Sequence, residues 1–235
     1  MTGDPPKPDA EFDEFADEYR ALLDQSVTAS GESGEYFANF KAQYAAGILG
    51  SDFTGTLLDY GCGVGLLTSF LLQAFPKAQV IGFDPSQASI RMAAQVAGKA
   101  HLTADESALP EKVDAIILAN VMHHVPLIER QSLIAALAEK LSPSGRLFIF
   151  EHNPANPVTR AAVCRCAFDR DAVLLRPQEV VKYMRQAQLD VLRHDYIVFF
   201  PRMLKWLRPM EKLLTWCPLG AQYAVVSTPN GLAQG

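Results

Sequence analysis

Long apolar runs are missing from this chain, although apolar residues make up 49% of its 235 positions. No uninterrupted apolar stretch reaches the roughly 18 to 20 residues that a membrane-spanning helix needs. The first residues, from Met1 to Glu11, contain prolines and acids but no apolar segment of the kind found in secretion signals. We therefore expect a globular protein of the cytoplasm with either one large α/β domain or one domain plus a small cap.

Cysteine is also scarce, with only four residues along the chain. Cys164 and Cys166 are separated by a single residue, which is closer than the usual zinc-binding or redox pair. A reduced compartment fits this usage. No metal site is predicted, and Cys62 is interpreted as a small residue in a glycine loop rather than as a nucleophile.

Positive charge is in short supply, since the net charge is −5. This balance argues against a general nucleic-acid binder. The charge is unevenly distributed: residues 1–35 hold ten acids and two bases, whereas the remainder holds 16 acids and 19 bases. We therefore expect no nucleic-acid partner.

The most informative stretch is Leu57-Leu58-Asp59-Tyr60-Gly61-Cys62-Gly63-Val64-Gly65, which is followed by a helix-like segment. An apolar run, an acid and three alternate glycines predict a strand, a tight loop and a helix. Because glycine has no Cβ, such a loop turns sharply and a ligand can approach its backbone. The helix behind it offers unpaired N–H groups and a partial positive charge.

A second apolar strand ends in Asp84, which lies 19 residues after Gly65. Dinucleotide-binding folds use an acid about 20 residues past the glycines to hold ribose hydroxyls. The dinucleotide pattern G-x-G-x-x-G fails here, because its third glycine would fall on Leu66. The loop reads D-x-G-x-G-x-G, which speaks against an oxidoreductase that binds NAD(P) on a similar sheet.

The segments LLDYGCGVG and VIGFDPS together resemble the first two motifs of the class I S-adenosylmethionine-dependent methyltransferases. The resemblance extends to about residue 151 and less clearly to residue 228. It implies S-adenosylmethionine as methyl donor, S-adenosylhomocysteine as product, and in-line methyl transfer to a small or lipid-like organic acceptor. A methyltransferase-like domain that serves as a non-catalytic partner subunit is the alternative, and the intact glycine loop and ribose acid argue against it.

The resemblance also implies a set of cofactor-binding residues: Asp59, Gly61, Cys62, Gly63, Gly65, Asp84, Pro85, Asp105, Glu106, Asn120 and Tyr19. Asp84 would hold the ribose, and Asp59 would order the loop or reach the amino group of the cofactor. Asp105 is preferred over Glu106 as the acid that accepts from the adenine amino group, with a solvated loop acid as the alternative. Tyr19 either touches the methionine part or anchors its own helix.

His123 and His124 are the candidate general bases, because histidine titrates near neutrality and can take a proton from a hydroxyl. A base is needed only if the acceptor arrives protonated. A His-His pair after this strand is frequent in family members with different chemistry, so packing is the alternative role. Glu151 and His152 follow the fifth strand beside the same crevice, but nothing in their spacing requires a metal.

The alternation between residues 56 and 150 predicts a doubly wound α/β fold. Strands are expected near 56–60, 78–83, 100–104, 113–119 and 146–150, followed by strands at 189–200 and 221–228. The fold class is a mostly parallel seven-stranded sheet with an antiparallel last strand, N-terminal cap helices and a helical insertion at 155–176. The predicted units are an acidic leader with cap helices (1–50), a cofactor-binding core (51–154) and the remainder (155–235).

Residues 202–216 form an amphipathic segment, in which Met203, Leu207, Met210 and Leu214 recur at near-helical spacing among four basic residues. Pro209 is expected to kink this helix. Three interpretations remain open: a helix that covers the sheet, the wall of a site for an apolar acceptor, or a helix that contacts a membrane surface.

Overall fold

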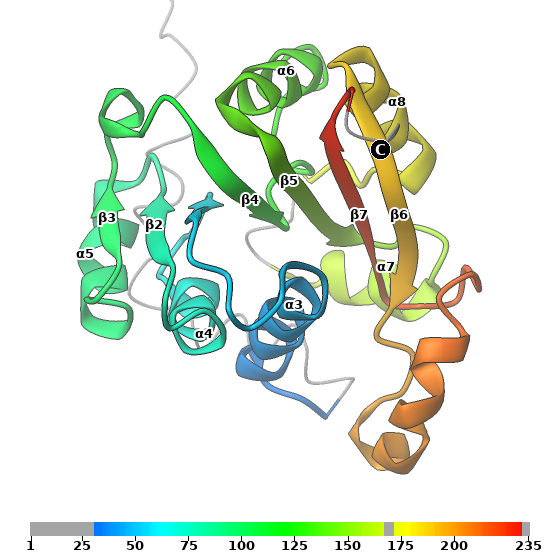
Figure 1. The fold of residues 1–235 in the computed structure, drawn as a ribbon. Coiled ribbons are helices and arrows are strands. Elements are labelled where there is room, and N and C mark those ends of the chain that lie inside the picture. Colours follow the sequence, from blue (N-terminus) through cyan, green and yellow to red (C-terminus); the bar gives the residue numbers. More distant parts are fainter. Residues whose placement is uncertain (1–30, 167–171, 232–235) are drawn as a thin grey trace, which may run out of the picture.

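Seven strands form one mixed sheet in the order β3-β2-β1-β4-β5-β7-β6 in the computed structural model, which describes residues 31–166 and 172–231. Strands β1 to β5 run parallel to one another, whereas β7 is antiparallel to both β5 and β6 (Figure 1). The predicted sheet, with its antiparallel last strand, is confirmed. The strands are β1 (Thr56–Tyr60), β2 (Gln79–Phe83), β3 (His101–Thr103), β4 (Val113–Ala119), β5 (Leu141–His152), β6 (Leu189–Ile197) and β7 (Gln222–Pro229).

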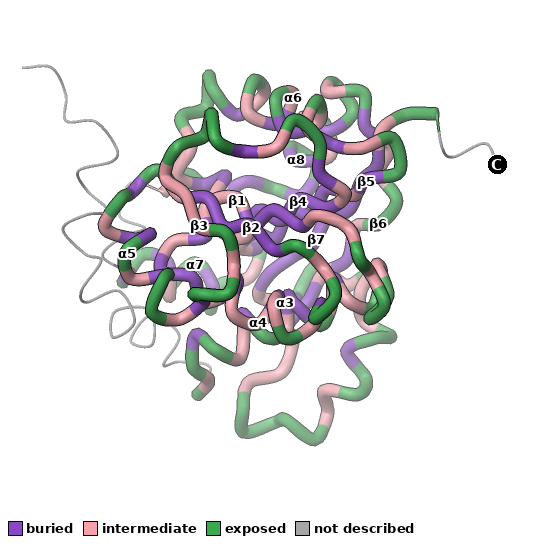
Figure 2. Tube along the Cα trace, turned by 60° about the vertical axis from the view of Figure 1, so that its left-hand side comes forward, coloured by how far each residue is buried: buried purple, intermediate pink, exposed green. Residues whose placement is uncertain are grey.

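Helices pack on both faces of the sheet. Figure 2 shows α6 and α8 on one side of the strands and α3 and α4 on the other. The described helices are α3 (Gly34–Leu49), α4 (Leu66–Ala74), α5 (Gln87–Val96), α6 (Arg130–Lys140), α7 (Pro157–Val163) and α8 (Pro177–Gln186), with the 3₁₀ segments η2 (Glu106–Ala108) and η4 (Arg202–Leu213). None of the helices in these two described ranges is long and apolar enough to cross a membrane.

Strand β4 explains why the core has two halves. Ile116 and Leu118 belong to the apolar cluster that contains the buried residues of α6 and α8, whereas Ala115 and Ile117 belong to the cluster with α3 and α4. All four side chains are fully buried. A continuous apolar strand is expected when both faces of a parallel sheet are covered.

Strand β5 begins at Leu141, five residues before the strand expected near 146–150. Leu141 pairs with Val113, and Arg146 pairs with Ala115, so six residues of β5 lie opposite three residues of β4. This irregularity places Ser142 to Gly145 inside the strand's bounds as a bulge. The preceding helix, α6, begins at Arg130, after a turn formed by residues 126–129.

The segments that flank the core are only partly described. The second predicted cap helix is α3, and the helical insertion after β5 contains α7 with Asn156 as its N-cap. The Asn156 side chain accepts hydrogen bonds from the N–H groups of Val158 and Thr159. The first predicted cap helix, with Tyr19, lies outside the described residues. The division at residues 50 and 154 stays a prediction.

The segment predicted as an amphipathic helix is the 3₁₀ segment η4, and most of its apolar side chains are exposed, whereas Leu207 and Leu214 are half-buried. Met203 is 82% exposed, Trp206 71% and Trp216 75%. Glu211 points inward instead, and its carboxylate accepts hydrogen bonds from the N–H groups of Phe199 and Phe200. The interpretation as a cover helix is therefore wrong, and Figure 1 shows the segment, in orange, beyond the ends of β6 and β7.

Candidate functional site

A crevice with a volume of about 860 Å³ opens at the carboxyl ends of β1, β2, β4 and β5. Strand β1 is followed along the chain by its neighbour β2, whereas β4 lies on its other side, so the strand order reverses there. Ligands of open α/β sheets bind at such a switch point. Helix α3 lines the opposite wall with Phe37, Ala38 and Lys41.

The glycine loop has the backbone that the sequence predicts. Gly61, Gly63 and Gly65 have φ values of 77°, 52° and 78°, in the left-handed region that favours glycine. A Cβ on Gly61 would lie 2.5 Å from Cγ2 of Val121, and one on Gly65 would lie 2.8 Å from Cβ of Ala93. The loop therefore excludes side chains on steric grounds and leaves its backbone against the crevice.

Asp84 joins the end of β2 to this loop. Its Oδ2 accepts a hydrogen bond of 2.8 Å from the N–H of Gly63, and its Oδ1 accepts one of 3.0 Å from Ser86. Both Asp84 and Pro85 line the crevice. The ribose acid predicted from sequence thus lies against the glycines, 21 residues apart in the chain.

Asp59 lies beneath the loop and is 1% exposed. Its Oδ2 accepts a hydrogen bond of 2.7 Å from the hydroxyl of Thr68, the third residue of α4. Burial raises the pKa of Asp59 to about 7, and the charge of Asp84 acts in the same direction, although the Thr68 hydroxyl opposes them. Asp59 therefore connects β1 to α4 and also lines the crevice.

The two candidate adenine-binding acids have different surroundings. Asp105 caps η2 by accepting hydrogen bonds from the N–H and hydroxyl of Ser107, and it is absent from the crevice lining. Glu106 lines the crevice and accepts a hydrogen bond of 2.9 Å from the Tyr60 hydroxyl. Of the two acids, Glu106 therefore lines the crevice, whereas Asp105, the preferred candidate, does not.

Cys62 lies within the glycine loop, and Asn120 follows β4 at the same crevice. Burial raises the pKa of the Cys62 thiol well above its ordinary value, so the thiol stays protonated. Asn120 has a φ of 60° and donates its backbone N–H to the carbonyl of Phe150. Its Oδ1 is buried with no hydrogen-bond partner, although the side chain lines the crevice. Such an atom is suited to accept from a bound ligand.

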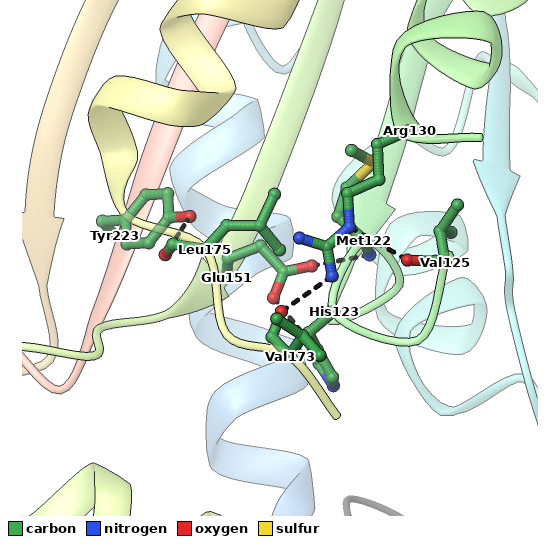
Figure 3. Close-up of polar contacts among 8 residues, drawn as sticks. All are labelled: Met122, His123, Val125, Arg130, Glu151, Val173, Leu175 and Tyr223. Carbon is green, nitrogen blue, oxygen red and sulfur yellow. Dashed lines mark hydrogen bonds and ion pairs between the residues drawn. The ribbon is translucent and has the colours of Figure 1, made fainter. Parts of the chain in front are cut away.

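His123 is paired with a residue that sequence reasoning did not assign to it. Nδ1 of His123 lies 2.5 Å from Oε2 of Glu151, and both side chains are 1% exposed (Figure 3). The other Glu151 oxygen accepts from the N–H of Met122. Burial alone would raise the pKa of Glu151, but His123, His152 and the Met122 N–H together lower it. Glu151 is therefore an ionised carboxylate that orients the imidazole.

The other two histidines of the crevice stack near this pair. The ring centroids of His123 and His124 are 4.2 Å apart, and those of His123 and His152 are 5.3 Å apart. All three side chains line the crevice. Within the described part of the chain, no group of three or more His, Cys, Asp or Glu residues is arranged to hold a metal ion.

The segment at 172–176, before α8, is held by hydrogen bonds against the loop that carries His123. The N–H of Val173 donates to the carbonyl of His123, and the Arg130 guanidinium donates to the carbonyls of Val125 and Val173. The Tyr223 hydroxyl donates to the carbonyl of Leu175 (Figure 3). These bonds fix the backbone on both sides of the His123 side chain.

Lys41 is the second crevice residue that sequence reasoning missed. It is 5% exposed, and it lies on the buried face of α3 with Ala38, Ala42 and Ala45. Burial lowers its pKa to about 8, while the charges of Glu151 and Asp59 act in the opposite direction. The feature of the sequence that could have identified it is a lysine at helical spacing within an otherwise apolar helix face.

Comparison with known proteins identifies the family. Residues 18–208 match the family model described as a methyltransferase domain. A ubiquinone biosynthesis O-methyltransferase from Bradyrhizobium diazoefficiens is 28% identical over 166 residues, which cover 64% of each chain. An uncharacterised protein from Synechococcus is 35% identical over 40% of this chain and 24% of its own length. A ubiquinone/menaquinone C-methyltransferase from Syntrophotalea carbinolica is 32% identical over 48% of this chain and 50% of its own.

Solved structures share the fold over nearly the whole chain. The magnesium protoporphyrin IX methyltransferase from Synechocystis, crystallised with S-adenosylmethionine, superposes with a TM-score of 0.66 at 15% identity, covering 97% of this chain and 100% of that one. The putative methyltransferase from Haloferax volcanii in complex with the activator Trm112 gives a TM-score of 0.67 at 18% identity, covering 94% and 98%. Since the family model spans most of the sequence, the protein belongs to the methyltransferase-domain family.

Proposed function

We propose that this protein transfers a methyl group from S-adenosylmethionine to a small or lipid-like organic acceptor. The observation that carries the proposal is the hydrogen bond between Gly63 and Asp84, which joins the left-handed glycine loop and the ribose acid into one surface. The relatives support an organic acceptor, because their names refer to ubiquinone biosynthesis and to trans-aconitate. The matched regions cover no more than 64% of the first relatives' lengths, so their substrates serve here only as guides.

The crevice residues fit the donor in two groups. Asp84, Pro85 and Glu106 line the end at β2 and would hold the adenosine part, with Glu106 in the role first expected of Asp105. The backbone of the glycine loop and the Asn120 side chain would hold the methionine part. The unpartnered Oδ1 of Asn120 favours a bound ligand here.

When bound, S-adenosylmethionine supplies a methyl group that its sulfonium charge already activates. The protein then has to align the acceptor and exclude water. His123 is the proposed base for an acceptor that arrives protonated, because Glu151 holds the tautomer with a proton on Nδ1 and leaves Nε2 as the proton-accepting nitrogen. Glu151 acts as a positioning residue, and His124 packs on the ring.

Calorimetric titration with S-adenosylhomocysteine, with NADH as the control, tests this proposal. We expect binding of the first ligand alone, followed by methyl transfer when small organic acids, phenols and quinols are screened as acceptors. Binding of NADH alone would favour the oxidoreductase. Binding of S-adenosylhomocysteine without turnover on any acceptor would favour a non-catalytic partner subunit.

A second proposal concerns the apolar patch of η4 and the residues after it, formed by Met203, Trp206, Met210, Leu213, Trp216 and Leu219, each at least 51% exposed. We propose that this patch contacts a membrane surface. Arg202, Lys205 and Lys212 are exposed around it, and the nearby acid Glu211 is turned inward. Exposed aromatics flanked by basic residues are suited to an interface with anionic lipids. A lipid-like acceptor would be found at such a surface.

A further inference from the structure

The ammonium of Lys41 is an isolated cation in the wall of the crevice. The residue is 5% exposed and lines the crevice from α3, between alanines that are at most 6% exposed. Within residues 31–166 and 172–231 its ammonium makes no side-chain hydrogen bond and no ion pair. An ionised group that leaves water without a partner costs several kcal/mol, so buried charges are normally paired.

The carboxylates that affect Lys41 electrostatically are already engaged with other groups. Glu151 contacts His123 and the Met122 N–H, and Asp59 accepts from the Thr68 hydroxyl. They support the positive charge at a distance, but neither contacts the ammonium. The donor hydrogens of Lys41 therefore remain available to a ligand in the crevice.

Lys41 also differs in charge from the rest of the crevice. The acidic side chains that line it are Asp59, Asp84, Glu106 and Glu129, and Lys41 is the one lysine or arginine among the described lining residues. Asn120 and Gln222 add two buried side-chain oxygens without partners, which accept but do not donate. An anionic group on a ligand thus has one strong donor to meet, on the side of α3.

We propose that Lys41 is the anion-binding residue of the crevice and that it takes a carboxylate of a bound ligand. This inference rests on the proposed function, which supplies two sources for the carboxylate: the methionine part of the cofactor, or an acceptor that is itself an organic acid. In both cases the ammonium and the carboxylate meet among apolar side chains, where a charge-assisted hydrogen bond is stronger than in water.

The test compares Lys41→Met and Lys41→Arg with the wild type, using three probes. S-adenosylhomocysteine carries the methionine carboxylate, 5′-methylthioadenosine lacks it, and benzoate stands for an acidic acceptor. Lys77→Met is the matched control, because Lys77 is 60% exposed and pairs with Asp52 away from the crevice. Calorimetry measures each affinity, and thermal unfolding without ligand checks that each variant is folded.

If the carboxylate belongs to the cofactor, Lys41→Met should weaken the binding of S-adenosylhomocysteine by roughly 10- to 100-fold and leave the affinity for 5′-methylthioadenosine unchanged. If the carboxylate belongs to the acceptor, Lys41→Met should leave the affinities for both nucleosides unchanged. The affinity of benzoate for the S-adenosylhomocysteine complex should then fall by at least roughly tenfold. Lys41→Arg should retain part of the affinity for the ligand that Lys41→Met binds more weakly. Lys77→Met should match the wild type throughout.

Equal affinities of wild type and Lys41→Met for all three probes would overturn the proposal, including the case in which benzoate binds to neither. A lowered unfolding temperature of Lys41→Met with unchanged affinities would show that Lys41 is only a structural counter-charge. Failure of both nucleosides to bind the wild type would count against the methyltransferase function instead. Benzoate titration of the free protein would then still decide whether Lys41 holds an anion.

Discussion

Glu151 and His123 lie 28 residues apart in the chain, yet their side chains meet within 2.5 Å in the dry interior beneath the crevice. The parallel pairing of β4 with β5 brings them together, because Ala119 lies opposite Phe150 at the ends of the two strands. A carboxylate that holds Nδ1–H of an imidazole fixes its tautomer and its orientation.

Glu151→Gln is therefore expected to reduce kcat by about 10²- to 10⁴-fold if methyl transfer needs a base, with the affinity for S-adenosylhomocysteine unchanged. The amide keeps the size of the side chain but no longer enforces the tautomer. The acid limb of the pH–rate profile should move to lower pH, because the imidazole loses a neighbouring negative charge. Steady-state kinetics and calorimetry measure both quantities, with the exposed Glu139→Gln as control. An unchanged profile would remove Glu151 from the mechanism.

Asp84→Ala is expected to weaken S-adenosylhomocysteine binding by roughly 1–3 kcal/mol, the usual cost of leaving buried polar partners unmatched. Two effects combine here, since the ribose loses its acceptor and the Gly63 N–H loses the bond that holds the loop. Asp105→Ala serves as the matched control, because this acid lies outside the crevice lining. An Asp84 variant that binds as tightly as the wild type would contradict the assignment of the second motif.

Gly61→Ala and Gly47→Ala should shift stability in opposite directions. A Cβ at Gly61 needs a φ of 77° and meets Val121 at 2.5 Å, so we expect a loss of at least about 1–2 kcal/mol and of cofactor binding. A Cβ at Gly47 meets nothing within 4 Å inside α3, so we expect a gain of about 0.4–1 kcal/mol. Urea unfolding measures both, and a stable Gly61→Ala protein would contradict the loop geometry.

Asp59 and Lys41 should change the free energy of unfolding with pH in opposite directions. The folded-state pKa of Asp59 is raised to about 7, so the folded protein binds the proton more tightly and stability should fall as the pH rises from about 4 to 7. The folded-state pKa of Lys41 is lowered to about 8, so the unfolded chain binds the proton more tightly and stability should rise from about pH 8 to 10.5.

Urea unfolding as a function of pH measures the two slopes separately. Asp59→Asn should flatten the acid side and extend the alkaline slope to lower pH, because the Asp59 charge supports the charge of Lys41. Lys41→Met should flatten the alkaline side and extend the acid slope to higher pH, because the Lys41 charge lowers the pKa of Asp59. Lys77→Met should change neither, because Lys77 is exposed. Slopes that survive both substitutions would mean that other groups titrate between the folded and unfolded states.

How much the sequence predicts depends on whether the signal is local. The apolar run of β4 and the alternate glycines after β1 are contiguous, and both were located within a residue or two. The pairing of Glu151 with His123 depends on the register between β4 and β5, which no local pattern encodes. For η4, the periodicity identified the apolar residues but gave the wrong buried face, because Glu211 is held inward by the backbone N–H groups of Phe199 and Phe200.

The exposed patch of η4 should bind vesicles that contain phosphatidylglycerol and not vesicles of phosphatidylcholine alone. Burying a large apolar side chain contributes about 1.5–3 kcal/mol, and each nearby base about 1 kcal/mol at an anionic surface. The double variant Trp206→Ser with Trp216→Ser should therefore reduce co-sedimentation by at least about tenfold. High salt should weaken wild-type binding, because the charges are exposed.

Ile128→Ser is the matched control for this prediction, since Ile128 is 89% exposed on another part of the surface. It removes a large exposed apolar side chain without touching η4, so vesicle binding should be unaffected. Light scattering of the free proteins tests whether a second copy of the chain covers the patch instead of a membrane. This would be the case if the wild type is a dimer, if the tryptophan substitutions dissociate it, and if the wild type binds no vesicles. Vesicle binding that survives the tryptophan substitutions would place the lipid contact elsewhere on the molecule, because the two rings are among the most exposed apolar groups of the patch.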